Sequence, residues 1–495
     1  MILEVEIQMK RKWLAVGIIL LFIGTGIIPS TAQDIEKSSP PSSRGVWLYV
    51  GGSGPGNYTK IQDAVDNASS GDTVFVYDDS SPYYETVYIS KSINLIGENT
   101  NTTTIIDTDW FDPVLTIVKS NVLVTGFTIK GETGYGSFKP GIYIKSNNNS
   151  IYGNNISSGR GITLDWCSNN SIFKNIISGY SYDGIGGDGW YLKVENNTIF
   201  STGSGCSIFM YVISHVFFNN NLLVQTSTYP CIRVDGSDGQ SVISNNTLQN
   251  GVLWYNFGPL NDIVSNNTVN GKPLVFLYNV SDRLIDYDAG QVIISRCDNI
   301  TIENQNFSNL EYHLQMHDSM NCKIIDNIIS NAKRYRSIEI SNSDNIVVMN
   351  NKIISTQIEF SDCNNISISK NTITKSLEGI NFGFCNNITI SYNNLIDNFR
   401  DITFRYECRN CSVCCNNFVS HKLINKLFNI HINIFDPVSS NNTVKRNYWE
   451  RPRLFPKPIY VRIYEGDPYY PDNTTHCFYF DWHPKLIPYN ISGMR

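Results

Sequence analysis

The chain repeats one short pattern along most of its length, and this repeat limits the folds open to it. Two copies, DCNNISISKNTI and FCNNITISYNNL, begin at Asp362 and Phe384. The pattern recurs at steps of mostly 20 to 26 residues, which places its repeated polar residue at Asn154, Asn175, Asn197, Asn220, Asn246, Asn267, Gln305, Asn327, Asn351, Asn371, Asn393, Asn416 and Asn447. Such a period indicates a solenoid, whose stacked units bury a continuous core.

Each unit consists of strands. Ile366 and Ile368 alternate with polar residues, as do Ile388 and Ile390, and β-branched and aromatic residues are frequent. A period of two residues is typical of a strand, and helical spacing is absent within the units. We therefore predict an all-β fold: a single-stranded right-handed parallel β-helix of about 13–14 coils, with a short N-terminal capping helix.

The repeated Asn has a structural interpretation. At a buried turn its amide can bond the equivalent amide one coil above and one coil below, which satisfies polar groups inside the stack. Eight residues before it, one turn position holds a small residue: Cys167, Cys297, Cys363, Cys385, Cys408, Ser146, Ser319 or Ser343. A free Cys behaves there as a small hydrophobe, so we interpret these cysteines as packing residues.

The segment CRNCSVCC, from Cys408 to Cys415, has a spacing that invites a zinc or iron–sulfur interpretation. However, Cys408 and Cys411 occupy inward positions of the coil, whereas Cys414 and Cys415 replace turn residues. The four sulfurs then point in different directions. We predict no metal site and favour a local disulfide, which an oxidising compartment permits.

Both ends of a β-helix need a cover because their strand edges are otherwise exposed. At the front, Thr59 and Gln62 match a capping box that opens a short helix. The predicted divisions are a signal peptide (1–32), a linker (33–45), an N-terminal cap with the first coils (46–130), the β-helix repeats (131–449) with an excursion at 270–295, and a C-terminal cap (450–495).

The start of the chain indicates its destination. The basic residues Lys10 to Lys12 precede an apolar run, Trp13 to Ile28, and a small-residue cleavage pattern at Ala32. This predicts a secretory signal, with an uncleaved anchor as the alternative. No later stretch is apolar enough to span a membrane. We predict an extracellular or cell-surface protein, and about eighteen N-x-S/T sequons offer sites for glycans.

Two carboxylates are expected on the outer face of adjacent coils. Ile338 and Ile340 point inward, so Glu339 faces out, and the same alternation places Glu359 in the equivalent position of the next coil. Carboxylates about 5 Å apart repel each other, which raises the pKa of one of them. The pair suits a retaining glycosidase or a Ca²⁺ site. The alternative is a solvated surface column.

Further polar residues are expected near this pair. His313 and His317 flank Gln315 on the same face, and Asp165 and Arg405 are expected in the column of His317. We assign Glu339 and Glu359 to catalysis, and we assign to substrate binding Gln315, His313, His317, Asn381 and Arg405. Arg233 and Asp235 face the same side several coils away. The two His lie about 13 Å apart along a strand with Met316 on the opposite face, so no copper site is predicted.

The front segment GNYTKIQDAVDNASSGDTVFV, the segment from NGKPL to DAGQVII and the Asn-anchored coils together resemble the NosD family. That family is similar to the pectin-lyase-like β-helices that bind or cleave carbohydrates. The resemblance extends from about Val46 to the C-terminus and implies a secreted parallel β-helix. The family name implies maturation of a periplasmic copper site, but no copper motif can be carried over residue by residue.

Two classes of function follow. A module for carbohydrate binding, adhesion or surface structure is favoured, because no complete catalytic set is present. The alternatives are a polysaccharide lyase or glycoside hydrolase and, after it, a NosD-like copper factor. The expected partner is a carbohydrate or a cell-surface polymer. A net charge of −6 gives no reason to expect nucleic acid.

Overall fold

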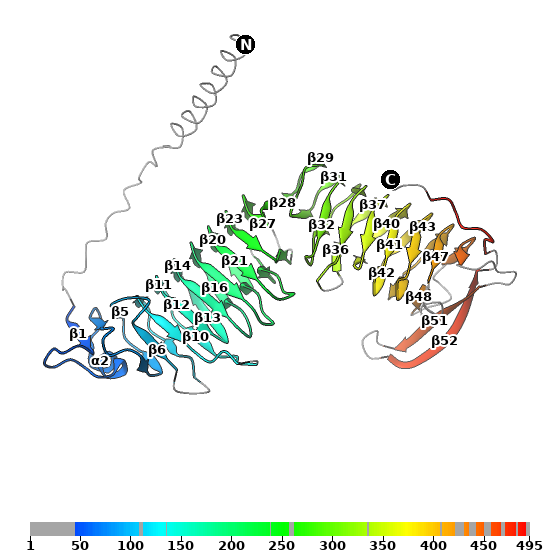
Figure 1. Ribbon diagram of the computed structural model, residues 1–495. Coiled ribbons are helices and arrows are strands. Elements are labelled where there is room, and N and C mark those ends of the chain that lie inside the picture. The colour runs from blue at the N-terminus through cyan, green and yellow to red at the C-terminus, as the bar shows by residue number, and fades with distance from the viewer. Residues whose placement is uncertain are drawn as a thin grey trace, which may run out of the picture. The chain divides into compact units, whose positions relative to one another are not determined.

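The structure is a computed structural model that describes residues 45–107, 112–134, 136–237, 239–256, 262–333, 336–405, 408–420, 430–434, 442–449, 457–466, 471–481 and 484–491. The predicted signal peptide and nearly all of the predicted linker lie outside these residues. Within them, no helix has the length and apolar character needed to cross a membrane. The predicted all-β parallel solenoid is confirmed: coils of short strands follow one another in chain order (Figure 1).

The first part of the stack has three parallel sheets. Sheet A contains β1 (Trp47–Val50), β2 (Thr73–Val76), β5 (Asn94–Gly97), β8 (Leu123–Thr125), β11 (Ser150–Tyr152), β14 (Ser171–Phe173), β17 (Lys193–Glu195), β20 (Phe217–Asn219), β23 (Val242–Ser244) and β26 (Ile263–Ser265). Sheet B contains β3 (Tyr83–Tyr84), β6 (Thr104–Ile106), β9 (Thr128–Lys130), β12 (Asn155–Ser158), β15 (Ile176–Gly179), β18 (Thr198–Ser201), β21 (Leu222–Gln225), β24 (Thr247–Gln249) and β27 (Thr268–Val269). Sheet C contains β4 (Val87–Ile89), β7 (Leu115–Ile117), β10 (Pro140–Ile144), β13 (Arg160–Ser168), β16 (Ile185–Trp190), β19 (Ile208–Ser214), β22 (Ile232–Val234) and β25 (Leu253–Tyr255).

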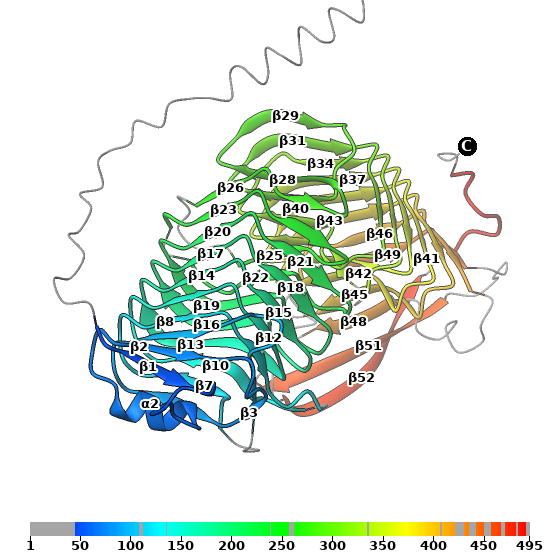
Figure 2. The same cartoon turned by 60° about the vertical axis from the view of Figure 1, so that its left-hand side comes forward.

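The second part has three further sheets, and Figure 2 shows their strands side by side along the stack. Sheet D contains β28 (Lys272–Tyr278), β30 (Gln291–Ser295), β33 (Leu314–His317), β36 (Arg336–Ser341), β39 (Gln357–Ser361), β42 (Glu378–Gly383), β45 (Arg400–Arg405), β48 (Ile430–Ile434), β51 (Lys457–Gly466) and β52 (Pro471–Asp481). Sheet E contains β29 (Ser281–Ile285), β31 (Asp298–Glu303), β34 (Lys323–Ile325), β37 (Asp344–Met349), β40 (Asn364–Ser369), β43 (Asn386–Ser391), β46 (Ser412–Cys414) and β49 (Thr443–Lys445). Sheet F contains β32 (Asn306–Ser308), β35 (Ile328–Ser330), β38 (Lys352–Ile354), β41 (Thr372–Thr374), β44 (Asn394–Ile396), β47 (Asn417–Val419) and β50 (Tyr448–Trp449).

The number of turns exceeds the 13–14 coils that the Asn pattern predicts. Within the described residues, sheet A alone has ten strands and sheet E has eight. The first five strands of sheet A precede Asn154, where the Asn pattern begins, and the first four of them belong to earlier coils. A count based on the repeated Asn therefore omitted the coils that lack it.

The core explains why the strands alternate. Ile338 and Ile340 are fully buried in β36, and each pairs with the equivalent apolar residue of β39. Further along the same column the rings of Phe360, Phe382 and Phe404 stack, with centroids 5.1 and 5.2 Å apart. Each coil therefore buries its inward side chains against the coils before and after it, which no coil could do alone.

The predicted Asn ladder is present, with one correction. Asn371 Nδ2 donates to Asn393 Oδ1 over 3.0 Å, and Asn371 Oδ1 accepts from Asn351 Nδ2 over 3.0 Å. In the coil that contains the run Asn219 to Asn221, however, the ladder residue is Asn221, whose side-chain oxygen accepts from Asn197. Asn220, the predicted member, instead adopts a left-handed backbone conformation with φ 54°. A run of identical residues gave the sequence pattern no means of choosing among them.

The small residue at the turn is buried, whether it is Cys or Ser. Cys363 Sγ donates to the carbonyl of Ser361 over 3.2 Å, and Ser343 Oγ donates to the carbonyl of Ser341 over 2.8 Å. Cys and Ser thus make the same local contact. All eleven cysteines for which the structure describes the thiol are unpaired, so the disulfide expected in the CRNCSVCC segment does not form.

The helix at the front is α2 (Ile61–Asn67), but its cap differs from the prediction. The N-cap residue is Lys60, which makes no side-chain cap. Instead, the carboxylate of Glu85 accepts from the backbone N–H groups of Ile61 and Gln62, over 2.8 and 3.0 Å. The Gln62 side chain bonds both the N–H and the carbonyl of Tyr88, which lies in β4. Contacts with Glu85 and Tyr88 therefore take the place of the local capping box that the sequence predicts.

The segment 270–295 forms strands of the stack. β28 is antiparallel to β27 and then parallel to β30, so it begins sheet D. β29 pairs in parallel with β31 and begins sheet E. The segment is therefore where one set of three sheets gives way to the next.

Candidate functional site

The outer face of sheet D carries a column of polar side chains. Strand register pairs Gln315 of β33 with Glu339 of β36, Glu339 with Glu359 of β39, and Glu359 with Asn381 of β42. Because the flanking Ile338 and Ile340 point into the core, these residues lie on the outer side of the sheet. The four residues meet in the order that the sequence predicts.

The two carboxylates of this column have different partners. Arg336 Nε lies 2.8 Å from Glu359 Oε2, and Gln357 Nε2 lies 3.4 Å from the same oxygen. Glu339 has only a long contact of 3.4 Å from Gln315 Nε2. Glu359 is therefore ion-paired with Arg336, whereas Glu339 has no ion-pair partner among the described residues.

The electrostatics of Glu339 follow from this arrangement. Burial raises the pKa of Glu339, and the nearby Glu359 carboxylate raises it further, while Arg336, Gln315 and Trp254 oppose the shift. The environment of Glu339 thus favours its protonated form more than that of an ordinary Glu, whereas Glu359 has an ion pair with Arg336. Two neighbouring carboxyl groups in such different environments are a recurrent arrangement for acid–base chemistry.

Aromatic side chains border the acidic pair. Trp254 comes from β25, the last strand of sheet C, and its ring centroid lies 6.3 Å from that of Tyr312, which precedes β33. The Trp254 indole nitrogen favours the charged form of Glu339 but makes no hydrogen bond of normal geometry. Burial raises the pKa of Tyr312, and the charge of Glu311 and Glu339 adds to this effect.

Sequence reasoning missed Trp254, Tyr312 and Arg336. Trp254 lies on a different sheet from the Glu pair, and among the described strands β25 pairs with β22 and with no strand of sheet D. Gln291 of β30 makes the connection instead: its side chain bonds both the N–H and the carbonyl of Leu253, over 3.0 and 2.7 Å. A register count along one sheet could not reveal this contact.

The predicted His residues do not form part of the outer site. His313 is fully buried, with its ring 5.3 Å from Phe307 and Nδ1 3.0 Å from Ser337 Oγ, so its expected position on the outer face is wrong. His317 does lie at the edge of the outer face, where Nδ1 is 2.5 Å from Ser341 Oγ. Burial lowers the pKa of each imidazole to about 4. Both rings are therefore neutral at physiological pH.

Two other predicted neighbours are engaged elsewhere. Arg405 lies in the column of His317, but its guanidinium pairs with Glu378 over 2.6 Å, as does that of Arg400. Asp165 lies on sheet C and not on sheet D, so its expected place in the column of His317 is wrong; it accepts from the hydroxyl of Tyr143 over 2.7 Å. Within the described part of the chain, neither Arg405 nor Asp165 forms a hydrogen bond or an ion pair with Glu339 or Glu359.

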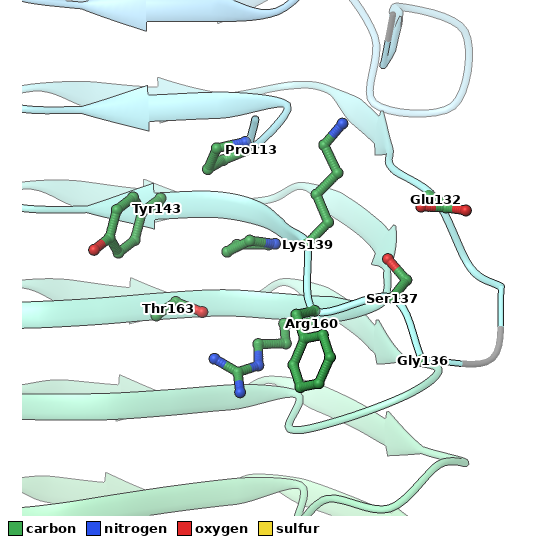
Figure 3. Close-up of a pocket in the computed structure, with 10 residues that line it drawn as sticks. Pro113, Glu132, Gly136, Ser137, Lys139, Tyr143, Arg160 and Thr163 are labelled. Carbon is green, nitrogen blue, oxygen red and sulfur yellow. The ribbon is translucent and has the colours of Figure 1, made fainter. Parts of the chain in front are cut away.

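A cavity of about 520 Å³ lies farther forward, on the outer side of sheet C. Figure 3 shows Tyr143 on β10, Thr163 and Arg160 on the neighbouring β13, and a loop beside these strands that carries Glu132 and Ser137. Sequence reasoning missed it, because its loop belongs to the coils before Asn154, where the Asn pattern gives no register. Its only sequence signal is the cluster of aromatic and basic residues around Phe138.

A family model described as the periplasmic copper-binding protein (NosD) matches residues 65–258 and 261–454. The chain belongs to the NosD family. No curated protein matches this member. Solved structures that it resembles include a pectin methylesterase from the rice weevil, at 14% identity and TM-score 0.34, over 49% of this chain and 94% of that one. An α-1,3-glucanase catalytic domain in complex with nigerose aligns at 12% identity and TM-score 0.33, over 82% of this chain and 70% of that one. At these TM-scores the likenesses carry no argument about function.

The copper in the family's description requires ligands that the described residues do not assemble. No group of three or more His, Cys, Asp or Glu side chains is placed to hold a metal within the described part of the chain. Burial raises the pKa of the thiols, to about 12 for Cys231 and Cys411, which disfavours the thiolate that binds metal. The Glu pair is also unlike a Ca²⁺ site, because Arg336 supplies the positive charge beside it and Ca²⁺ takes about six to eight oxygen ligands.

Proposed function

We propose that this NosD family member is a secreted protein that binds carbohydrate on the outer face of sheet D. A periplasmic or extracellular location accords with the family's description and with the predicted secretory signal. The ligand would be a sugar chain lying across the coils, beside the acidic pair and the aromatic rings of Trp254 and Tyr312.

The proposal depends on two buried amide oxygens that have no hydrogen-bond partner. Gln315 Oε1 and Asn381 Oδ1 lie on either side of Glu339 and Glu359 in the same column. The ladder amides satisfy each other, whereas these two acceptors in the outer column do not, and a buried acceptor without a partner calls for an explanation. Sugar hydroxyls would supply donors to the acceptors and to the carboxylates, and a sugar ring would pack on the aromatic faces.

Glu359→Gln tests the proposal. The substitution removes the charge that accepts from hydroxyls, so affinity for any glycan that the parent binds should fall about tenfold or more, as expected when charge-assisted hydrogen bonds are lost. The melting temperature should change little, because Arg336 is partly exposed and stays hydrated. A glycan array identifies the bound glycan, and calorimetry measures the affinity of each variant.

A matched control is available on another face. Glu195 occupies an outward, half-buried position of β17 on sheet A, so Glu195→Gln should bind as the parent does. The proposal would be wrong if the array showed no bound glycan, or if Glu359→Gln and Glu195→Gln bound equally well.

Hydrolysis at the same pair is the second candidate, and the divergence of the two carboxyl groups favours it. Glu339, with its raised pKa, would act as the acid, and Glu359, ion-paired with Arg336, would act as the nucleophile or base. Glu339→Gln should then abolish turnover of a glycan while preserving its binding. Release of reducing ends by the parent, and its absence in Glu339→Gln, is the measurement.

A further inference from the structure

The cavity on sheet C contains an arginine held between two aromatic rings. The Arg160 guanidinium lies 5.0 Å from the ring centroid of Tyr182 and 5.7 Å from that of Phe138. The two rings stack on each other, with centroids 4.4 Å apart and planes at 24°. Phe138 remains 60% exposed. The rings fix the guanidinium and leave an open aromatic surface beside it.

This guanidinium carries a charge without a counter-charge in contact. Among the described residues it makes no ion pair, and Arg160 Nε is buried without a hydrogen-bond partner. Lys139, the other cation of the cavity, is neutralised by a buried ion pair with Asp107. Asp183 interacts electrostatically with Arg160 but forms no ion pair with it. A buried donor without a partner and a cation without an ion pair are costly to maintain, so an external anionic acceptor is the simplest complement.

The chain provides its own comparison at Arg233, three strands farther along sheet C. Arg233 also lies against two rings, 4.7 Å from Trp254 and 5.2 Å from Phe209. Its guanidinium, however, is paired with Asp235 through bonds of 2.7 and 3.2 Å. The same cation-on-aromatic arrangement therefore occurs twice on this sheet, once neutralised and once open to the cavity.

We propose that the cavity beside Arg160 binds the anionic group of an acidic sugar, with the sugar ring packed on Phe138. The planar guanidinium matches a carboxylate or sulfate through paired N–H donors. Ser137 Oγ, buried and without a partner at the cavity wall, offers a donor to the same group or a neighbouring hydroxyl. A volume of about 520 Å³ accommodates a sugar unit.

This inference rests on the proposed carbohydrate binding and specifies its substrate class. Uronate carboxylates and sulfate esters share the required chemistry, so the test includes both. A glycan array should carry uronate-bearing, sulfated and neutral glycans, and the strongest acidic ligand should then be compared by calorimetry with its methyl-esterified or desulfated form. The parent should prefer the acidic form by about tenfold or more, and added salt should reduce this preference.

Arg160→Gln should remove the preference for the acidic form and leave the affinity for its neutral form unchanged. Arg160→Lys, which keeps the charge but loses the paired donors, should restore only part of the preference. Arg233→Gln is the matched control and should keep the full preference, because that guanidinium is already occupied. Circular dichroism of each variant confirms that the fold is retained.

The outcomes separate this inference from the proposed function. Neutral glycans bound as tightly as acidic ones, or an acidic preference that survives in Arg160→Gln, would overturn the inference and leave carbohydrate binding intact. A parent that binds no glycan at all would overturn both.

Discussion

Asn371 uses every hydrogen-bonding group of its side chain. Its Nδ2 donates to the carbonyls of Val348 and Ser369 and to Asn393 Oδ1, while its Oδ1 accepts from the N–H and the amide of Asn351. One residue thus connects three coils and pairs backbone groups that the turn leaves without a strand partner. The repeat could be identified from sequence because few residue types can meet all of these demands.

Replacing Asn371 by Leu should destabilise the protein by about 1–3 kcal/mol, because partners buried in the turn lose their bonds. Urea denaturation followed by circular dichroism measures the loss. Thr372→Leu, one residue on and half-buried on the outer side of β41, is the control and should change stability by less than about 0.5 kcal/mol. Equal stability of Asn371→Leu and the control would contradict the ladder's role.

Asp401 illustrates a residue whose state depends on pH. Burial raises the pKa of its carboxyl group from 3.8 to about 8, although Asn398 donates to it over 2.7 Å. The folded state therefore binds the proton more tightly than the unfolded state between these two values. The free energy of unfolding should fall as pH rises from about 4 to about 8 and then level off.

An Asn side chain cannot ionise, so Asp401→Asn should abolish the contribution of Asp401 to the fall in the free energy of unfolding with pH. At pH 8 the variant should be more stable than the parent by at least about 1 kcal/mol, since each unit of pKa difference corresponds to about 1.4 kcal/mol. Urea titrations at pH 5 and pH 8 supply the comparison, with exposed Asp318→Asn as the control. Parallel pH profiles for the parent and Asp401→Asn would refute the prediction.

Not every residue could be placed from the sequence. Glu339 and Glu359 were placed correctly because their neighbours alternate strictly, and strict alternation fixes the outward face. His313 stands just before β33, in a turn where alternation no longer holds, and its side chain enters the core. Period-two reasoning is reliable within a strand and fails at the turns.

At the scale of elements, the front helix depends on a contact from outside itself. α2 has only seven residues, and its first two N–H groups are satisfied by Glu85, which lies between β3 and β4. The sequence located the helix through its apolar face but assigned the cap to Thr59 and Gln62. A local motif cannot reveal a partner that arrives from the next coil.

Glu85→Ala should therefore loosen the N-terminal cap. Loss of a side-chain cap costs about 1 kcal/mol, and two N–H groups are affected here. Hydrogen exchange should show faster exchange at Ile61 and Gln62, while the amides of β36 and β39 exchange as in the parent. Exposed Asp112→Ala is the control; exchange at the helix start that matched this control would disprove the assignment of the cap.

At the scale of the whole molecule, the described residues contain two apolar cores that meet near the segment between β25 and β30. One core runs from Val50 to Tyr255 and includes Ile293, and the other contains Val292, Ile294 and the inward residues of sheets D, E and F. The acidic pair and Trp254 lie at this junction. The repeat predicted the coils on either side, but the contact across the junction depends on side chains and has no period.

Gln291 is the residue that joins the two parts. It is fully buried, and its amide satisfies both backbone groups of Leu253 and also donates to the carbonyl of Tyr312 over 3.0 Å. It therefore replaces the strand pairing that β25 would otherwise receive. Tyr312 borders the acidic pair, so the same amide links the stability of the stack to the shape of the proposed site.

Gln291→Met keeps the shape of the side chain but removes these bonds. Each backbone group left unpaired costs about 1–3 kcal/mol, and the cost falls on the junction alone. In a stack whose units are stabilised by their neighbours, a weakened interface separates cooperative units. Urea unfolding monitored by tryptophan fluorescence should therefore change from one transition in the parent to two, and glycan affinity at sheet D should fall.

Gln225→Met provides the control, because Gln225 is equally buried but bonds Gly205 and Pro230 within the first part of the stack. It should lower the midpoint while keeping a single transition. A single transition in Gln291→Met, with glycan affinity unchanged, would show that the junction is held by its apolar contacts and not by this amide.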